Sequence, residues 1–134
     1  MASVFFPKGK ELALGLLCGS GTKPTGTLKA ALVDTGTYTY SAAHQYYSSV
    51  TGVVGTPVAI GSPTFTSGVL DGADVTVTAV TGNTVEAIVV YLDTGSAATS
   101  PLVAYIDSAS AGLPFTPNGG DAIVTWNASG IGTI

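Results

Sequence analysis

The residues best suited to chemistry in this chain are two copies of Asp-Thr-Gly, at Asp34 to Gly36 and at Asp93 to Gly95. Each copy follows an apolar run, as the catalytic aspartates of aspartic proteases do. In those enzymes two carboxylates lie so close together that both cannot ionise, so one acts as a base while the other acts as an acid. The pair Asp34 and Asp93 is therefore a candidate for acid–base cleavage of a peptide bond.

Chain length argues against this protease interpretation. The stretch between Asp34 and Asp93 is too short for the lobe that a single-chain enzyme of this kind needs. A dimeric enzyme needs an apolar pair and Gly before a C-terminal helix, but Ile131-Gly132 lies too near the end. The alternative is structural, because Asp bonds the following backbone and Gly takes a positive φ where a strand ends. We expect no enzyme, with an aspartic protease as a remote alternative.

Other catalytic and metal-binding arrangements lack the residues that they need. His44 is the only histidine, and no Gly-x-Ser-x-Gly surrounds a serine, so a Ser-His-Asp triad has no support. Zinc sites take several His and Cys ligands, whereas this chain offers one of each, His44 and Cys18. Asp71 and Asp74 lack the alternating oxygen ligands of a calcium loop. We therefore expect no catalytic residue, no metal, no cofactor and no small-molecule substrate.

The composition favours short strands and a surface that neighbouring molecules cover. Charged residues make up only 9% of the 134 residues and hydrophobic residues 46%, which excludes a charge-rich disordered chain. All four cations are lysines and the formal net charge is -4, so the basic stripe that binds nucleic acid is missing. Low surface charge protects a free monomer poorly against association. We expect a homo-oligomer and no nucleic-acid partner.

One helix is predicted near the start of the chain. Residues Lys8 to Cys18 place apolar side chains at i,i+4 spacing, with Leu12 over Leu16 and Ala13 over Leu17. The apolar part of this segment is too short for a signal sequence. No run of about 18 apolar residues exists anywhere, so we expect no membrane span and no membrane partner.

Most of the remaining chain has the pattern of strands joined by turns. Val75 and Val77 alternate with polar neighbours, which is typical of a half-buried antiparallel strand. The continuous apolar run from Glu86 to Leu92 is suited to a strand buried on both faces. Further strands are expected over residues 28–33, 58–60, 64–66, 102–106 and 122–126.

Short strands with closely spaced turn signals predict a mainly β fold, a single antiparallel β-sandwich of jelly-roll or immunoglobulin-like type. The sandwich is expected over residues 28–134, with Trp126 as a core anchor. Residues 1–27 are expected to form an N-terminal arm, the short helix and a Gly/Thr linker. The pattern does not fix strand order, so both sandwich types stay open.

An apolar arm before the predicted helix is the first candidate for contact with a partner. It consists of Val4, Phe5, Phe6 and Pro7. A lone domain has little reason to keep such an arm exposed, so it is suited to docking on a neighbour. The alternative is that the arm packs on its own sheet.

A tyrosine-rich segment is the second candidate. Tyr38, Tyr40, Tyr46 and Tyr47 lie close together in a polar stretch, and aromatic rings with polar tips are suited to protein interfaces. A second short helix over Ser41 to Val50 is expected to carry Tyr46 and Tyr47. Packing in the core and its rim is one alternative, and a carbohydrate platform is another.

Several longer segments form a pattern over most of residues 28–134. They are Leu28-Lys-Ala-Ala-Leu-Val-Asp34, Tyr38-Thr-Tyr40, His44-Gln-Tyr-Tyr47, Asp71-Gly-Ala-Asp-Val-Thr-Val77, Ala87-Ile-Val-Val-Tyr-Leu-Asp93, Leu102-Val-Ala-Tyr-Ile-Asp107 and Pro117-Asn-Gly-Gly-Asp-Ala-Ile-Val-Thr-Trp-Asn127. In this order they resemble a family of small virion structural proteins of tailed bacteriophages. The pattern spans the chain and contains no catalytic signature.

The resemblance implies a capsid decoration or cement protein. Such a protein binds the outer surface of the head and bridges neighbouring capsomers, where many weak contacts become collectively strong. Its partners would be the major capsid protein and further copies of itself, with a trimer as one symmetric arrangement. We expect it at the capsid surface of the virion, after synthesis in the bacterial host cytoplasm. The alternative is a neck, tail or fibre-associated structural protein of the phage.

Overall fold

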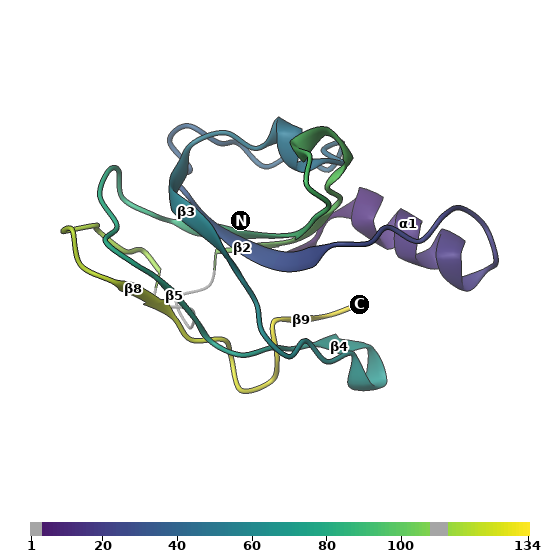
Figure 1. Ribbon diagram of the computed structural model, residues 1–134. Helices are drawn as coiled ribbons and strands as arrows, with labels where there is room; N and C mark the ends of the chain where they lie inside the picture. The colour runs from purple at the N-terminus through teal and green to yellow at the C-terminus, as the bar shows by residue number, and fades with distance from the viewer. Residues whose placement is uncertain (1–3, 108–112) are drawn as a thin grey trace.

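The chain folds into a mainly β structure with a short α-helix, as the composition predicts. The computed structural model describes residues 4–107 and 113–134 (Figure 1). Within these residues the α-helix is α1 (Pro7–Leu17), and short 3-10 turns are η1 (Tyr47–Ser49), η2 (Thr66–Gly68) and η3 (Ala97–Thr99). The strands are β1 (Val4–Phe5), β2 (Thr27–Val33), β3 (Val53–Ala59), β4 (Val69–Leu70), β5 (Val75–Val77), β6 (Ala87–Asp93), β7 (Leu102–Ile106), β8 (Ala122–Val124) and β9 (Gly132–Thr133).

Five of the strands form one antiparallel sheet in the order β1-β7-β6-β2-β3. β2 and β6 pair along their whole length, from Thr27 opposite Asp93 to Val33 opposite Ala87. β6 lies in the middle of the sheet, and its first five residues are buried. A strand in this position needs apolar side chains on both faces. The prediction that the run from Glu86 to Leu92 is buried on both faces is confirmed.

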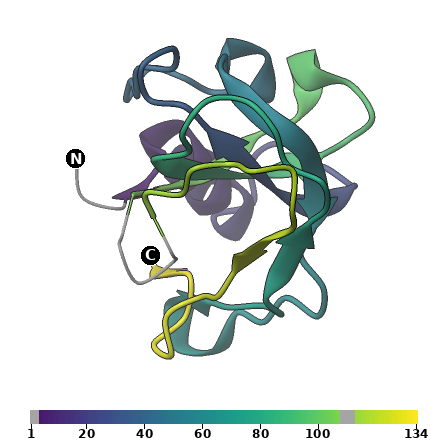
Figure 2. The ribbon, with the colours of Figure 1, turned by 90° about the vertical axis from the view of Figure 1, so that its left-hand side faces the viewer.

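One face of the sheet is covered by two short antiparallel ladders, β5–β8 and β4–β9 (Figures 1 and 2). Leu32 and Ile88 of the sheet pack in one apolar core with Val75 and Val77 of β5. Thr76 between these valines is exposed, so the predicted alternation is confirmed. The ladders are separate from each other. A β-sandwich of jelly-roll or immunoglobulin-like type therefore stays a prediction.

Trp126 closes an edge of this core, as predicted. Its side chain is 7% exposed, and its indole N–H donates to the carbonyl of Ala73 at 2.9 Å. Its backbone N–H donates to Asp74 Oδ1 at 3.0 Å. A buried indole requires a partner for its N–H group. These two bonds join the segment after β8 to the segment before β5.

The opposite face of the sheet carries an aromatic cluster. Phe6 lies at its centre with no exposed surface, and its ring centroid is 5.3 Å from that of Tyr40 and 6.5 Å from that of Tyr105. β1 is the outermost strand of the sheet and pairs with β7, with Val4 opposite Tyr105. This pairing holds Phe6 over the sheet. The N-terminal arm therefore packs on its own sheet, and the prediction that Phe6 contacts a partner is corrected.

Two predictions for the tyrosine-rich segment are also corrected. Tyr38 is only 2% exposed, so its side chain belongs to the core rather than to a partner surface. The helix predicted over Ser41 to Val50 is wrong, because only η1 forms there. The backbone bonds to another segment instead: the Tyr47 N–H donates to Ser100 O at 2.9 Å, and Gln45 O accepts from the Leu102 N–H at 3.0 Å. These contacts replace the bonds that a helix would make.

Phe6→Ala is expected to lower the free energy of unfolding by about 3 to 5 kcal/mol, the usual cost of deleting a buried aromatic ring. Phe65→Ala is the matched control, because the ring of Phe65 is 70% exposed. It is expected to change stability by less than about 0.5 kcal/mol. Urea unfolding followed by Trp126 fluorescence measures both variants. Equal losses would contradict the enclosure of Phe6 within the chain.

Candidate functional site

The two Asp-Thr-Gly motifs lie at opposite ends of the β2–β6 pair. Asp34 follows the last residue of β2, whereas Asp93 ends β6 and lies opposite Thr27. Because the strands are antiparallel, most of the length of β2, about 20 Å at the usual rise per residue, separates the two motifs. A shared proton requires two carboxylates in direct contact. Asp34 and Asp93 of one chain therefore do not form a catalytic dyad.

Both motifs are turns that end a strand. Asp34 Oδ1 accepts a hydrogen bond from the Gly36 N–H and Asp93 Oδ1 accepts one from the Gly95 N–H, each at 2.9 Å. The bond from Gly36 is the largest cause that lowers the pKa of Asp34. The Lys29 ammonium, 2.7 Å from Asp93 Oδ2, is the main cause that lowers the pKa of Asp93. Both carboxyl groups thus favour the ionised form.

The Lys29–Asp93 ion pair is expected to make stability depend on pH in acid. The folded-state pKa of Asp93 is lowered, so the unfolded chain binds this proton more tightly. The contribution is therefore complete above the unfolded pKa of about 4 and is lost as the pH falls through the folded value. Lys29→Met is expected to reduce this dependence, measured by urea unfolding between about pH 5 and pH 2.

Lys23→Met is the matched control for this titration, because Lys23 is exposed in the loop after α1. It removes the same charge but leaves Asp93 with its partner. We expect its pH dependence to follow that of the natural chain. If Lys29→Met also followed the natural chain, the ion pair would make no contribution in solution.

Tyr38 lies at the buried end of the tyrosine-rich segment. Its hydroxyl is 2.8 Å from His44 Nδ1. Burial, followed by the nearby Tyr105 and Tyr40, raises the pKa of Tyr38 to about 12. The hydroxyl therefore stays protonated and can donate to a neutral His44 ring. The sole histidine of the chain thus has a structural partner in the aromatic cluster.

Tyr46 and Tyr47 lie nearer the surface. Tyr47 is half-buried and stacks on Tyr91 of β6, with ring centroids 3.9 Å apart and an angle of 5° between the planes. Tyr46 is 37% exposed, and its hydroxyl accepts a hydrogen bond from Gln45 Nε2 at 3.2 Å. Tyr46 is therefore the tyrosine of this segment that a partner would reach most directly.

The helix α1 projects from the sheet, and none of its residues is buried (Figure 1). Pro7 is its first residue and the exposed Cys18 caps its end. A helix of 11 residues is marginal in water by itself, so it depends on packing against other elements. Leu14 and Leu17 are nevertheless 59% and 82% exposed. The helix is confirmed, but these leucines face solvent.

The point at which α1 meets the sheet is Gly9. A Cβ atom at this position would lie 2.5 Å from the Leu102 carbonyl oxygen and 3.6 Å from Val103 Cα, both in β7. Real Cβ atoms do not approach backbone oxygen so closely, and the Leu102 carbonyl belongs to a paired strand that cannot move freely. The absence of a side chain at Gly9 therefore allows α1 to rest on β7.

Gly9→Ala is expected to lower the free energy of unfolding by about 1 to 3 kcal/mol, because the added methyl group pushes α1 away from β7. Gly15→Ala makes the same change in the same helix, where the nearest atom to a Cβ is 3.8 Å away. It is expected to raise the free energy of unfolding by about 0.5 to 1 kcal/mol through helix propensity. Urea unfolding measures both, and effects of the same sign would contradict the contact.

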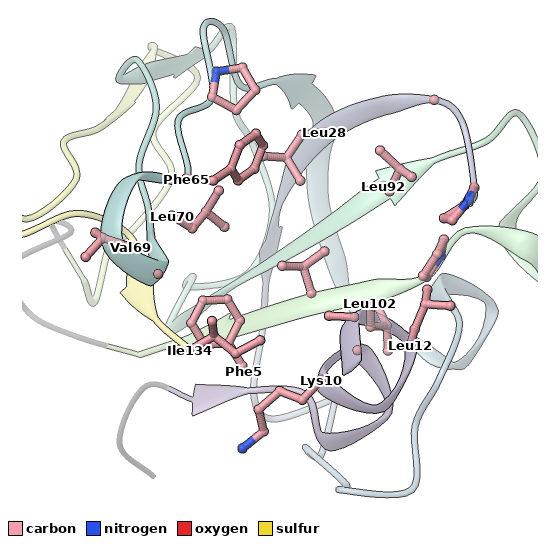
Figure 3. Close-up of a pocket in the computed structure, with 18 residues that line it drawn as sticks. Phe5, Lys10, Leu12, Leu28, Phe65, Val69, Leu70, Leu92, Leu102 and Ile134 are labelled. Atoms are coloured by element: carbon pink, nitrogen blue, oxygen red, sulfur yellow. The ribbon is translucent and has the colours of Figure 1, made fainter. Parts of the chain in front are cut away.

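A groove of about 550 Å³ opens beside α1, between the helix, the sheet and the region of β4 (Figure 3). The groove is lined by Leu12 of α1, Leu28 of β2, Phe65 in the loop before β4, and Ile134, which follows β9. Lys10 is the one charged residue among the described residues that line it. The groove lacks the convergent polar groups that orient a small polar ligand.

Apolar side chains continue from this groove into solvent. Phe65 and Ile134 are 70% and 59% exposed at its rim, and Leu14 and Leu17 of α1 are 59% and 82% exposed. We define the helix face as the groove together with Lys10, Leu14 and Leu17, which lie on one stripe of α1. An exposed apolar area of this kind marks a site of interaction with another molecule. The helix face is the candidate functional site.

Sequence reasoning named one part of this face and missed the rest. Phe5 was predicted to contact a partner, and it is half-buried in the wall of the groove. Val4 beside it is half-buried and Pro7 is exposed. The leucines at positions 12, 14, 16 and 17 surround the helix instead of forming one stripe, and this signal could have revealed an uncovered helix. The groove itself joins segments that are distant in the sequence.

In the part of the chain that the structure describes, no group of three or more His, Cys, Asp or Glu side chains is placed to hold a metal ion. No helix in the same residues is long and apolar enough to cross a membrane. No protein-family model matches the chain, and no curated protein sequence matches it.

Proposed function

We propose that this chain is a structural protein of a tailed-phage virion, namely a capsid decoration or cement protein. In this function it binds the outer surface of the head and stabilises the contacts between capsomers. The observation that carries the proposal is the helix face, where Leu14, Leu17, Phe65 and Ile134 are each more than half exposed. Apolar area of this kind is stabilised when a macromolecular partner covers it.

Two further features support an assembly function. The chain has only 12 charged side chains in the form of four lysines and eight acids, so a large part of its surface is neutral. Such a surface is suited to being covered by neighbours. Contacts of modest area then act together when many copies occupy one shell. The proposed partners are the major capsid protein and further copies of this chain.

The first test is the amount of this protein in purified virions, relative to the major capsid protein, by quantitative mass spectrometry. A decoration protein is expected at a near-stoichiometric ratio, because it repeats over the whole shell. A few copies per particle would overturn decoration and favour a neck, tail or fibre position. Absence from the particles would contradict any structural function in the virion.

The second test is co-sedimentation of the purified protein with heads that lack it. The natural chain is expected to sediment with the heads. Leu17→Asp is expected to bind at least about tenfold more weakly, because it places a charge in the apolar contact. Ala98→Asp adds the same charge at an exposed position of η3, outside the helix face, and is expected to bind normally. Equal binding of both variants would exclude the helix face as the contact.

A further inference from the structure

We propose that the helix face binds a second copy of this chain, at the outer face of the β5–β8 ladder, so that copies join head to tail. The inference rests on the proposed function, because it names a neighbour that the helix face contacts. We define the ladder face as the exposed residues of this ladder and its two ends: Asp74, Thr76, Asp121, Ile123 and Thr125.

Charge is divided unequally along the chain. Three of the four lysines, Lys8, Lys10 and Lys23, lie in α1 or the loop after it, together with a single acid, Glu11. The other seven acids all follow residue 26, in a part of the chain that contains only one lysine. That lysine, Lys29, is paired with Asp93. Residues 1–26 therefore carry a formal charge of +2, with Lys8 paired to Glu11 at 3.0 Å, and residues 27–134 carry a formal charge of -6.

The ladder face lies at the other end of the molecule from α1. In Figure 1, β5 and β8 are at the left and α1 extends to the right. Figure 2 views the molecule from the side of the ladder, and α1 is behind the strands. Two surfaces at opposite ends cannot meet within one chain. They can meet between copies, and the same contact can then repeat from one copy to the next.

The chemistry of the ladder face complements that of the helix face. Ile123 is 67% exposed at the middle of β8, opposite Thr76 of β5. Asp121 lies two residues before Ile123 and so points to the same side of the strand. Asp74, before β5, is exposed at the other end of the ladder. An isoleucine between two carboxylates thus matches the exposed leucines of α1 beside Lys10.

The carboxylates of the ladder face are held in place by the fold. Asp121 Oδ1 accepts a hydrogen bond from the Ala79 N–H at 3.2 Å, and Asp74 Oδ1 accepts one from the Trp126 N–H at 3.0 Å. Among the ion pairs seen in the described residues, neither acid has a lysine partner. Both negative charges are therefore positioned and available to lysines of another copy.

A symmetric contact between two helix faces is disfavoured by the same charges. In such a dimer Lys10 of each copy would approach Lys10 of the other, and like charges at an interface oppose binding. The ladder face offers carboxylates instead. A head-to-tail contact uses two different surfaces, so it closes into a ring or continues as a filament. A closed ring is the arrangement suited to a decorated shell.

Sedimentation velocity of the purified protein over a range of concentrations tests the proposal. The average mass is expected to rise with concentration at about 50 mM salt and to rise less at about 500 mM salt, because screening weakens the charge contacts. Leu17→Asp alters the helix face and Ile123→Lys alters the ladder face. Each variant alone is expected to stay monomeric. Both positions are exposed, and circular dichroism verifies that each variant folds.

An equal mixture of the two variants separates a head-to-tail contact from a symmetric one. Leu17→Asp retains its ladder face and Ile123→Lys retains its helix face, so the mixture is expected to form dimers and nothing larger. Ala98→Asp and Thr56→Lys carry the same charges at exposed positions outside both faces. These controls are expected to associate like the natural chain.

Three results would overturn the inference: a natural chain that stays monomeric throughout, an Ile123→Lys variant that associates normally, or a mixture that forms no dimer. The result is independent of the amount of protein in virions. A monomeric protein that is abundant on the shell would refute the head-to-tail contact and leave the proposed function intact. A protein that associates head to tail but is absent from virions would refute the proposed function and leave the head-to-tail contact intact.

Discussion

The pairing of β2 with β6 is the interaction on which the rest of the structure depends. Seven consecutive residues of each strand are paired, and alternate side chains point to opposite faces. Leu32 and Ile88 thereby reach the core under the ladders, whereas Val33 and Val89 reach the aromatic cluster. A shift of one residue in this register would exchange the two sets of side chains. The register therefore determines what each face can bury, and both layers that cover the sheet follow from it.

The same pairing separates the two Asp-Thr-Gly motifs in space. Because β2 and β6 are antiparallel, their C-terminal ends lie at opposite ends of the strand pair, so two identical local signals form two separate turns. Asp93 is fixed by Lys29 across the pair, and Asp34 accepts bonds from Gly36 and Asn83. The two motifs are therefore turns of the same kind, each ending a strand with a hydrogen bond from a Gly N–H to the Asp carboxylate.

The sheet also separates the molecule into two chemically different ends. α1 leaves β1 at one end and contacts β7 through Gly9, which has no side chain to keep the helix away. The β5–β8 ladder lies at the other end, where Asp74 and Asp121 have no lysine partner among the ion pairs of the described residues. In the proposed assembly, the α1 end of one copy contacts the ladder end of the next.

Local patterns in the sequence by themselves determined the mainly β class, α1, β2, β6, β7 and the burial of Trp126, because periodicity and turn chemistry act over a few residues. Only the tertiary structure decided which apolar side chains are covered. Phe6 and Tyr38 are enclosed while Leu14 and Leu17 face solvent, although all four are apolar or aromatic. It also decided that residues 41–50 are not helical, since their backbone bonds to residues 100–102. Burial and such long-range bonds depend on which distant segments meet, and no local pattern contains that information.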